Sequence, residues 1–465
     1  MLHISGHMCS KIVLLMRSIQ KEGPIENYRI VFIGALLTAS LAAVGCVSNN
    51  PSVNTTNTNP SAANTQPAPA NANIAVTQPP PLSENTTITL PVIDAMFADE
   101  SFSGELKSKA GLTDDQVVKL QQTARDAVLK LDESDLNAST KASTALANNE
   151  IKKIVGDQKA PQVIDLVRQR WEGSGDQSML SGRPNAVPTD TRIVINAPAY
   201  RMDVYRDGQL EKSYKVGIGY PEFPLPRGMR QAKEIIFNPT WTPPDSPWVR
   251  GKFAPGKTVE AGSKDNPLGP IKIPIGLPSL IHGGKNPAKL GSFASHGCVG
   301  LTNEGIEDFA QLIAPLAGNS LSLADIKEHE KDRSKTEEMK LQKPVPVELR
   351  YETIVVEDGK VHIYRDVYEL GTNTEDNLRN VLAAYDVDLD QLDQSVKQQL
   401  MDALQSMAVD AKGDPVDEDD SKAANSGKKS KSGRITTTIK GKKEVVVEVP
   451  QLAGKGYPAP VNLKG

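Results

Sequence analysis

Cysteine, aromatic residues and long apolar runs are all scarce in this chain of 465 residues. Three cysteines and an aromatic content of 5% exclude a disulfide-rich scaffold, and 33 prolines with 35 glycines indicate ordered domains separated by linkers. The most apolar run, Ile30 to Val44, is shorter than the ~20 residues that a membrane-spanning helix needs. A net charge of −4 argues against a dedicated nucleic-acid binder, because neutralising phosphates requires a basic domain. We therefore expect no nucleic acid among the partners.

The same apolar run has the features of an export signal. It follows Arg29 and ends in small residues before Cys46. The segment from Ala43 to Cys46 resembles a bacterial lipobox, in which the cysteine is lipidated and becomes the new N-terminus. We predict a signal peptide at 1–45, lipidation at Cys46, a membrane anchor through that lipid, and a location in the cell envelope or periplasm. Signal cleavage without lipidation is the alternative.

Export and lipidation would leave a single free thiol. Removal of the signal takes away Cys9, lipidation uses Cys46, and only Cys298 remains. Disulfides are then excluded within the exported chain. Because an unpaired thiol is a liability in an oxidising compartment, Cys298 is a candidate for a reactive role.

Composition and periodicity divide the remainder of the chain. Residues 46–87 are rich in Asn, Thr, Pro and Ala and show no apolar period, whereas 88–180 show the spacing of helices. Short strand-like runs separated by Gly and Pro follow, with Asp207-Gly208 as a hairpin turn. The predicted fold class is a multidomain chain with a mostly-β domain, a helical N-terminal accessory domain and disordered linkers. Its parts are a tether at 46–87, the helical domain at 88–180, the β domain at 190–370, a helical segment at 371–410 and a charged low-complexity tail at 411–465.

Three local patterns support this division. Thr113 to Gln116 form a capping box, which predicts a helix entrance at Leu112. Val347 to Tyr364, with Asp358-Gly359 between them, predict one more hairpin of the β domain. In the tail, an acidic block precedes a basic block, and Glu444 to Val449 could form a strand within it.

Histidines and glycines surround the one remaining thiol. Ile281-His282-Gly283-Gly284 is followed by Ser295-His296-Gly297-Cys298. A nearby imidazole can take the thiol proton and so activate the sulfur as a nucleophile. The glycines let backbone N–H groups approach an oxyanion, a role that Gly297 and Cys298 could fill.

Two simpler interpretations compete with catalysis. His282, His296 and Cys298 could hold a structural zinc, but no second cysteine is available and the gap between His296 and Cys298 is shorter than common ligand spacings. Cys298 could also be a buried structural residue, which would not account for the glycines around it.

The spaced histidine and the Ser-His-Gly-Cys sequence resemble the signature of the L,D-transpeptidase catalytic domain, the YkuD family. Lys215 to Gly219, Asn238 to Pro244, Asn266 to Gly269, and Tyr351 through Tyr368 also resemble segments of its exported, ErfK-type members. The resemblance covers roughly residues 190 to 368. It implies a two-sheet β fold and a cysteine acyltransferase that acts on peptidoglycan stem peptides, without metal or nucleotide cofactor.

Residue roles carried over from the resemblance are expectations. Cys298 would be the nucleophile, His282 its general base, His296 a pocket residue, and Gly297 with Cys298 the oxyanion donors. The family commonly has Arg or Asn where this chain has Gly300. Either a donor to the substrate is missing here, or Lys285 or Lys289 in the intervening loop supplies the cation. We also expect substrate contacts from Gly283, Ser295, Trp241 and Lys285.

The implied reaction forms a thioester on Cys298 and releases terminal D-Ala. A second amine, from another stem or from a protein lysine, would then resolve the thioester. Two alternatives stay open: hydrolysis of the same thioester, as in an L,D-carboxypeptidase, and a non-catalytic wall-binding lipoprotein. The sequence does not choose among the acceptors.

Overall fold

The computed structural model describes residues 87–131, 139–173, 175–243, 249, 256–410, 413, 415 and 441–463. All of these belong to one of the two units of the chain, residues 71–465. The predicted signal, Cys46 and nearly all of the predicted tether lie outside the described residues. Among the residues described, no helix is both long and apolar enough to cross a membrane.

The region expected to be helical consists of helices α1 to α5. Each helix turns apolar side chains toward one shared core, which extends from Ile88 to Trp171. Their bounds are α1 (Leu90–Met96), α2 (Glu100–Ala110), α3 (Asp114–Leu129), α4 (Thr140–Val155) and α5 (Ala160–Glu172). The prediction of a helical region between 88 and 180 is consistent with these bounds.

Helix α3 shows why this region is helical. The Thr113 hydroxyl accepts from the Gln116 N–H at 3.2 Å, and the Gln116 side chain accepts from the Thr113 N–H at 3.1 Å. This is the predicted capping box, which satisfies two donors that a helix start leaves without partners. Leu120 and Ala124, four residues apart, are fully buried on the inner face.

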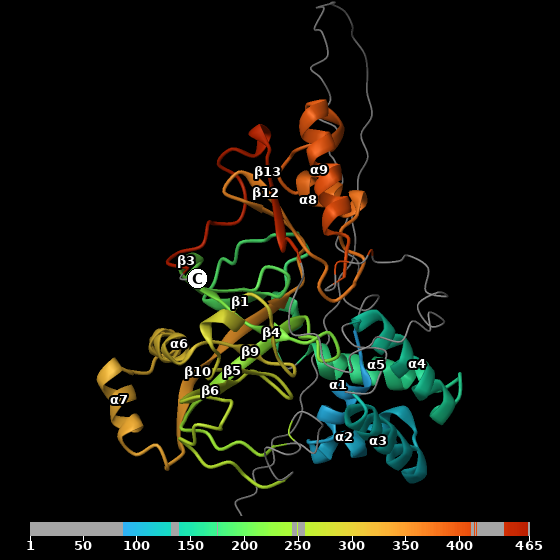
Figure 1. Cartoon of the computed structure of the whole chain (residues 1–465), viewed down its shortest axis with the longest axis vertical. Helices are drawn as coiled ribbons and strands as arrows, with labels where there is room; N and C mark the ends of the chain where they lie inside the picture. The colour runs from blue at the N-terminus through green and yellow to red at the C-terminus, as the bar shows by residue number, and fades with distance from the viewer. Residues whose placement is uncertain are drawn as a thin grey trace, which may run out of the picture. The chain divides into compact units, whose positions relative to one another are not determined.

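A large mixed sheet forms the centre of the catalytic region (Figure 1). Its strands lie in the order β3-β2-β1-β10-β5-β6-β7-β9. Pairs β1–β10 and β7–β9 are parallel, and the other neighbours are antiparallel. The bounds are β1 (Arg192–Asn196), β2 (Arg201–Arg206), β3 (Gln209–Lys215), β5 (Gly228–Phe237), β6 (Ile271–Pro274), β7 (Leu280–His282), β9 (Val299–Gly300) and β10 (Glu337–Arg350).

A second, two-stranded sheet pairs β4 (Ile218–Gly219) with β8 (Phe293–Ser295) in parallel. The predicted turn at Asp207-Gly208 joins β2 to β3, and both residues have positive φ, 48° and 79°. Helices α6 (Asn303–Leu316) and α7 (Leu323–Lys331) follow β9, and α6 buries Ile306, Phe309 and Ile313 in the core of the large sheet. The expected mostly-β, two-sheet catalytic domain is confirmed.

The other face of β1 is also covered. Ile193 and Ile195 point into the main core, whereas Val194 packs with Tyr205, Val355 and Tyr457. This explains why β1 is buried along almost its whole length instead of alternating with polar residues.

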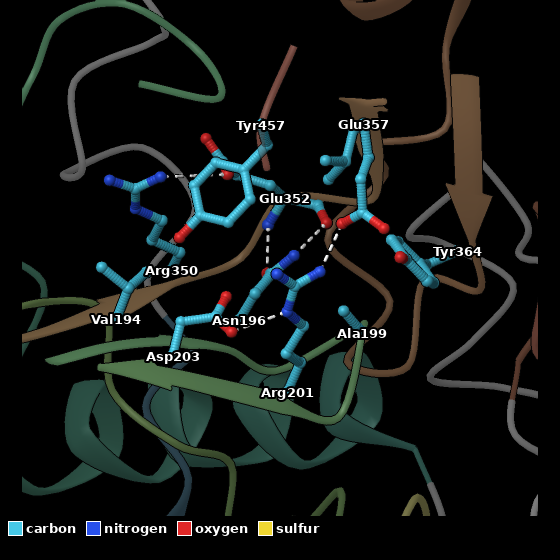
Figure 2. A pocket seen from close by; sticks show the side chains of 11 residues that line it. Val194, Asn196, Ala199, Arg201, Asp203, Arg350, Glu352, Glu357, Tyr364 and Tyr457 are labelled. Carbon is cyan, nitrogen blue, oxygen red and sulfur yellow. Dashed lines mark hydrogen bonds and ion pairs between the residues drawn. The ribbon is translucent and has the colours of Figure 1, made fainter. Parts of the chain in front are cut away.

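Buried ion pairs line a small cavity on this covered face (Figure 2). Arg201 pairs with Asp203 at 2.8 Å and also with Glu357. Arg350 pairs with Glu348 at 2.7 Å. Because each buried charge has an opposite charge beside it, the desolvation cost of the group is offset locally.

The C-terminal region differs from its predicted organisation. The hairpin at Asp358-Gly359 joins β11 (Ile354–Glu357) to β12 (Lys360–Tyr364), and β12 pairs with β13 (Glu444–Glu448), not with the large sheet. Helices α8 (Glu375–Ala383) and α9 (Gln394–Met407) share a core with these strands. The helices expected in 371–410 and the strand expected at Glu444 to Val449 are present, as α8, α9 and β13. They share one core with β11 and β12, so the boundaries at 370 and 411 do not separate these parts. Sequence spacing could not reveal a strand pair 80 or more residues apart.

Candidate active site

The candidate site lies where β7 and β9 run side by side. Their register places Ile281 beside Val299 and His282 beside Gly300. Cys298 directly precedes β9, so it lies opposite Leu280. Side chains alternate between the faces of a strand, and Ile281 and Val299 point into the core. His282 and Cys298 therefore share the opposite face of adjacent strands.

His282 is almost fully buried, with 3% of its surface exposed. Its Nδ1 lies 2.7 Å from the Gly283 carbonyl oxygen, which places a ring proton on Nδ1, and the Leu268 backbone also hydrogen-bonds the ring. Burial, with a smaller contribution from the Lys285 ammonium, lowers the pKa of His282 to about 3. The imidazole is therefore neutral near pH 7, which is the form that a general base requires.

Cys298 is a free cysteine. Burial raises the pKa of its thiol, while the Leu280 backbone and the Lys285 ammonium act in the opposite direction and favour the thiolate. The resting pair is therefore a neutral thiol beside a neutral imidazole.

Ser295 shapes the turn that presents the thiol. Its hydroxyl donates to the Cys298 carbonyl and accepts from the Cys298 N–H at 3.0 Å. The side chain is 4% exposed, so its contacts are with the turn itself and not with a cleft. The Ser295 hydroxyl fixes the backbone of the Cys298 turn, and its contact with substrate stays a prediction.

This turn also bears on the expected oxyanion donors. Gly297 has φ of 93°, a conformation that residues with a side chain rarely adopt. The Cys298 N–H is bound to Ser295 in this structure. Its use for an oxyanion would therefore require the Ser295 hydroxyl to give way, and Gly297 N–H stays the simpler expectation.

Lys285 lies directly across Gly300. A Cβ at position 300 would come within 2.6 Å of Lys285 Cγ and 2.7 Å of Cε, so only glycine leaves room for the lysine stem. The Lys285 N–H donates to the Leu301 carbonyl at 3.0 Å, which fixes its backbone beside β9. Lys285 interacts electrostatically with Cys298, and burial lowers its own pKa. Of the two lysines expected in this role, Lys285 is the one that the fold brings to the thiol; Lys289 is exposed in η2 (Pro287–Lys289).

Glycines after His282 allow a helix to approach. A Cβ at Gly283 would lie 2.7 Å from Ile306 Cγ2, and the Gly284 N–H donates to Asn303 Oδ1 at 2.8 Å. Gly283 is buried, so the structure places it in packing against α6. Asn303 is a residue that sequence reasoning missed, because nothing in its local sequence indicates a contact with the histidine segment.

His296 is enclosed by aromatic rings. Tyr220 and Phe223 meet it edge to face, each with ring centroids 4.9 Å from the imidazole. Burial, with the Lys285 charge as a smaller cause, lowers the pKa of His296 to about 3. Its role in shaping a substrate pocket stays a prediction. The two rings were missed because they lie more than 70 residues before His296, with no motif around them.

One more predicted residue, Trp241, comes from a different segment of the chain. Trp241 pairs its backbone with Val259 through hydrogen bonds of 3.0 and 2.7 Å, next to residues 244–248, which are not described. Its contact with substrate stays a prediction. The cavity of Figure 2 is lined by residues from other strands and includes neither histidine nor the thiol, so it is a separate feature.

Residues 190–347 match the YkuD family model, which describes the L,D-transpeptidase catalytic domain. The match ends at 347, within β10, and includes both His282 and Cys298. Among the described residues, no group of three or more His, Cys, Asp or Glu side chains is arranged to bind a metal ion.

Relatives of the YkuD region are similar over limited lengths. The Bacillus subtilis (strain 168) protein "Putative L,D-transpeptidase YqjB" is 26% identical over 135 residues, which are 28% of this chain and 69% of that protein. A Fuscovulum blasticum protein, "Putative L,D-transpeptidase in ATP synthase subunits region ORF 5", is 39% identical over 87 residues, or 18% of this chain and 44% of that protein. Among solved structures, the catalytic domain of an Enterococcus faecium L,D-transpeptidase is 15% identical with a TM-score of 0.24, covering 36% of this chain and 100% of that chain.

Proposed function

We propose that this protein is a peptidoglycan L,D-transpeptidase in which Cys298 forms a thioester with a stem peptide. The observation that carries the proposal is the placement of His282 and Cys298 on one face of the adjacent strands β7 and β9, inside a region that matches the L,D-transpeptidase family model. The neutral imidazole and the glycine-rich turn are the parts that thiol acyl transfer needs.

The first half of the proposed reaction is acylation. His282 takes the thiol proton, and the sulfur attacks the carbonyl that joins the diamino acid to terminal D-Ala. A carbon–sulfur bond forms, and the carbon–nitrogen bond to D-Ala breaks. The departing amine takes the proton back from His282, so D-Ala leaves as a neutral amine and the enzyme holds a thioester.

The second half transfers the acyl group to an amine. The acceptor amine attacks the thioester carbonyl and gives its proton to His282. The carbon–sulfur bond breaks, and the thiol of Cys298 regains its proton. When the acceptor is the diamino acid of another stem the product is a 3–3 crosslink, and when it is a protein lysine the product is an attached protein.

Lys285 is proposed as the cation of this site. Its stem lies over Gly300 and its ammonium acts on Cys298, so it favours the thiolate as the proton leaves. The same ammonium is available to a carboxylate of the stem peptide. Gly283 and Trp241 remain proposed substrate contacts.

Product analysis tests the proposal. Full-length protein is incubated with a stem tetrapeptide, and the products are separated and weighed by mass spectrometry. Crosslinked dimer with released D-Ala supports transpeptidation, whereas shortened tripeptide alone means that water resolves the thioester. No turnover and no adduct would leave a non-catalytic wall-binding role.

We also propose that the protein is anchored in the cell envelope by a lipid on Cys46. The lipobox-like residues before Cys46 are the basis for this proposal. Cys46→Ser is expected to move the protein from the membrane fraction to the soluble fraction after signal cleavage. Membrane retention of a cleaved Cys46→Ser variant would contradict lipidation as the anchor.

A further inference from the structure

A short loop next to the thiol is held by groups from outside the YkuD match. We call residues 219–225 the active-site loop. The loop begins at Gly219, the last residue of β4, and the next residue, Tyr220, donates its N–H to the Ser295 carbonyl at 2.9 Å. The rings of Tyr220 and Phe223, both in this loop, enclose His296. A Cβ at Gly219 would lie 2.0 Å from the Phe223 carbonyl oxygen and 3.3 Å from the Gly297 Cα. The loop therefore folds back tightly against the nucleophile turn.

Two threonines of the helical region contact the middle of this loop. The Thr89 hydroxyl donates to the Glu222 carbonyl at 2.7 Å, and the Thr140 hydroxyl donates to the Pro221 carbonyl at 2.8 Å. Both threonines have 0% exposure. Adjacent carbonyls of the loop are thus each satisfied by a buried donor from a different helix start, α1 and α4.

The start of α4 has a second attachment to the catalytic part of the chain. The Ser139 hydroxyl and the Lys141 N–H both donate to the Glu369 carboxylate, at 2.7 and 3.0 Å. Glu369 follows Tyr368, whose hydroxyl donates to the Gly219 carbonyl at 2.9 Å and accepts from the Leu225 N–H at 3.3 Å. Tyr368 therefore fixes both ends of the active-site loop, while the threonines fix its middle.

We propose that the helical region is a working part of the active site: Thr89 and Thr140 hold the active-site loop in the position that keeps Tyr220 and Phe223 against His296. They are positioning residues, because they touch neither the thiol nor the catalytic histidine. A buried carbonyl left without its donor costs free energy, so the loop would leave this position more often when a threonine hydroxyl is removed. The catalytic consequence rests on the proposed function, whereas the structural consequence does not.

Thr140 is the better test position, because Ser139 caps α4 and Thr140 does not. Thr140→Val keeps the shape and removes the donor, and Thr140→Ser keeps the donor. Thr144→Val is the matched control: it makes the same change one turn further along α4, at a buried hydroxyl that has no hydrogen-bond partner. Thr89 also caps α1 by accepting from Val92 N–H, so its substitution would remove both the helix cap and the hydrogen bond to the Glu222 carbonyl.

The experiment uses the full chain with isotope-labelled histidine, with His296 assigned by comparison with His296→Gln. Thr140→Val is expected to shift the His296 ring signals, because the ring currents of Tyr220 and Phe223 change when the loop moves. Loss of one neutral hydrogen bond should lower kcat/KM with stem tetrapeptide by about 2- to 12-fold. Thr140→Ser should keep the His296 signals and kcat/KM of the wild type, and so should Thr144→Val.

Unchanged His296 signals in Thr140→Val would overturn the proposal. So would signals and kinetics that change equally in Thr144→Val, since that result would mean a general effect on α4. If the wild type shows no turnover at all, the proposed function fails, but the His296 signals still decide whether the helical region positions the loop.

Discussion

Two segments meet at His296, and they are fixed in different ways. The β7–β9 pair is set by backbone register, with His282 beside Gly300 and Cys298 two residues before Gly300. The active-site loop at 219–225 has its ends and its middle fixed by side-chain hydrogen bonds from Tyr368, Thr89 and Thr140. The first arrangement is built inside the signature segments, and the second depends on residues 81 to 149 positions away.

This difference separates the residues proposed to take part in the reaction from the residues that hold the active-site loop in place. Changes on the strand pair should alter thiol reactivity while leaving stability nearly unchanged, because they remove reactive groups without opening the core. Changes to the hydrogen bonds of the loop should lower stability and reactivity together. The following predictions test that separation.

The largest effect is expected from His282→Ala. Loss of a general base typically costs ~10²- to 10⁴-fold in rate, so acylation by stem tetrapeptide should fall by that factor. The measurement is single-turnover acylation, with circular dichroism to confirm the fold. His329→Ala, in helix α7, is the control and should acylate normally. Normal acylation by His282→Ala would show that another group activates the thiol.

Lys285→Met should have the next largest effect. Methionine keeps a stem over Gly300 but removes the charge that favours the thiolate, so the thiol pKa should rise further. A nearby opposite charge is worth about one pKa unit or more, which predicts alkylation of Cys298 about 10-fold slower near neutral pH. Rates of alkylation against pH provide the test, and Lys289→Met is the matched control. Identical alkylation profiles for Lys285→Met and Lys289→Met would show that the Lys285 charge does not lower the pKa of the Cys298 thiol.

Tyr368→Phe tests the loop side of the comparison. It leaves the Gly219 carbonyl and the Leu225 N–H without this partner, which should lower the free energy of unfolding by about 1 to 3 kcal/mol. Urea unfolding measures the loss. Tyr385→Phe removes a buried hydroxyl that donates to the Asn185 carbonyl, outside the loop. Thiol alkylation should change in Tyr368→Phe but not in Tyr385→Phe; equal behaviour would argue against a special role for the loop.

The smallest effect is a pH dependence at Glu369. Burial raises its pKa to about 7, although hydrogen bonds from Lys141 N–H and Ser139 oppose the shift. The folded chain therefore binds this proton more tightly than the unfolded chain, and stability from this group falls as pH rises from about 4.5 to about 7. Glu369→Gln should flatten the fall in Tm across that range, whereas Glu338→Gln, at an exposed carboxylate, should not. Parallel Tm curves for Glu369→Gln and wild type would contradict the prediction.

The sequence predicted whatever depends on neighbouring residues. The capping box at Thr113, the hairpin at Asp207-Gly208 and the paired His282 and Cys298 segments are local patterns, and each is in the structure. The resemblance to the YkuD family is likewise confirmed for residues 190–347.

What could not be predicted depends on contacts between distant segments. The pairing of β12 with β13 joins Val361 to Val447, and no periodicity in either strand identifies its partner. The same holds for Asn303 beside Gly284, and for Phe223 beside His296. The two hydrogen bonds of the Ser295 hydroxyl with the Cys298 backbone were also missed, whereas the predicted contact of Ser295 with substrate stays a prediction. Side-chain direction in a tight turn is set by packing, which the sequence does not state.

Acylation of Cys298 by a stem peptide is tested most directly by mass spectrometry of the protein. Full-length wild type is mixed with stem tetrapeptide and quenched in acid, its intact mass is measured, and it is then digested to locate any adduct. We expect a thioester-linked tripeptide on the peptide that contains Cys298, with release of D-Ala, and no adduct on Cys298→Ala. An adduct on another residue, or turnover by Cys298→Ala, would contradict it.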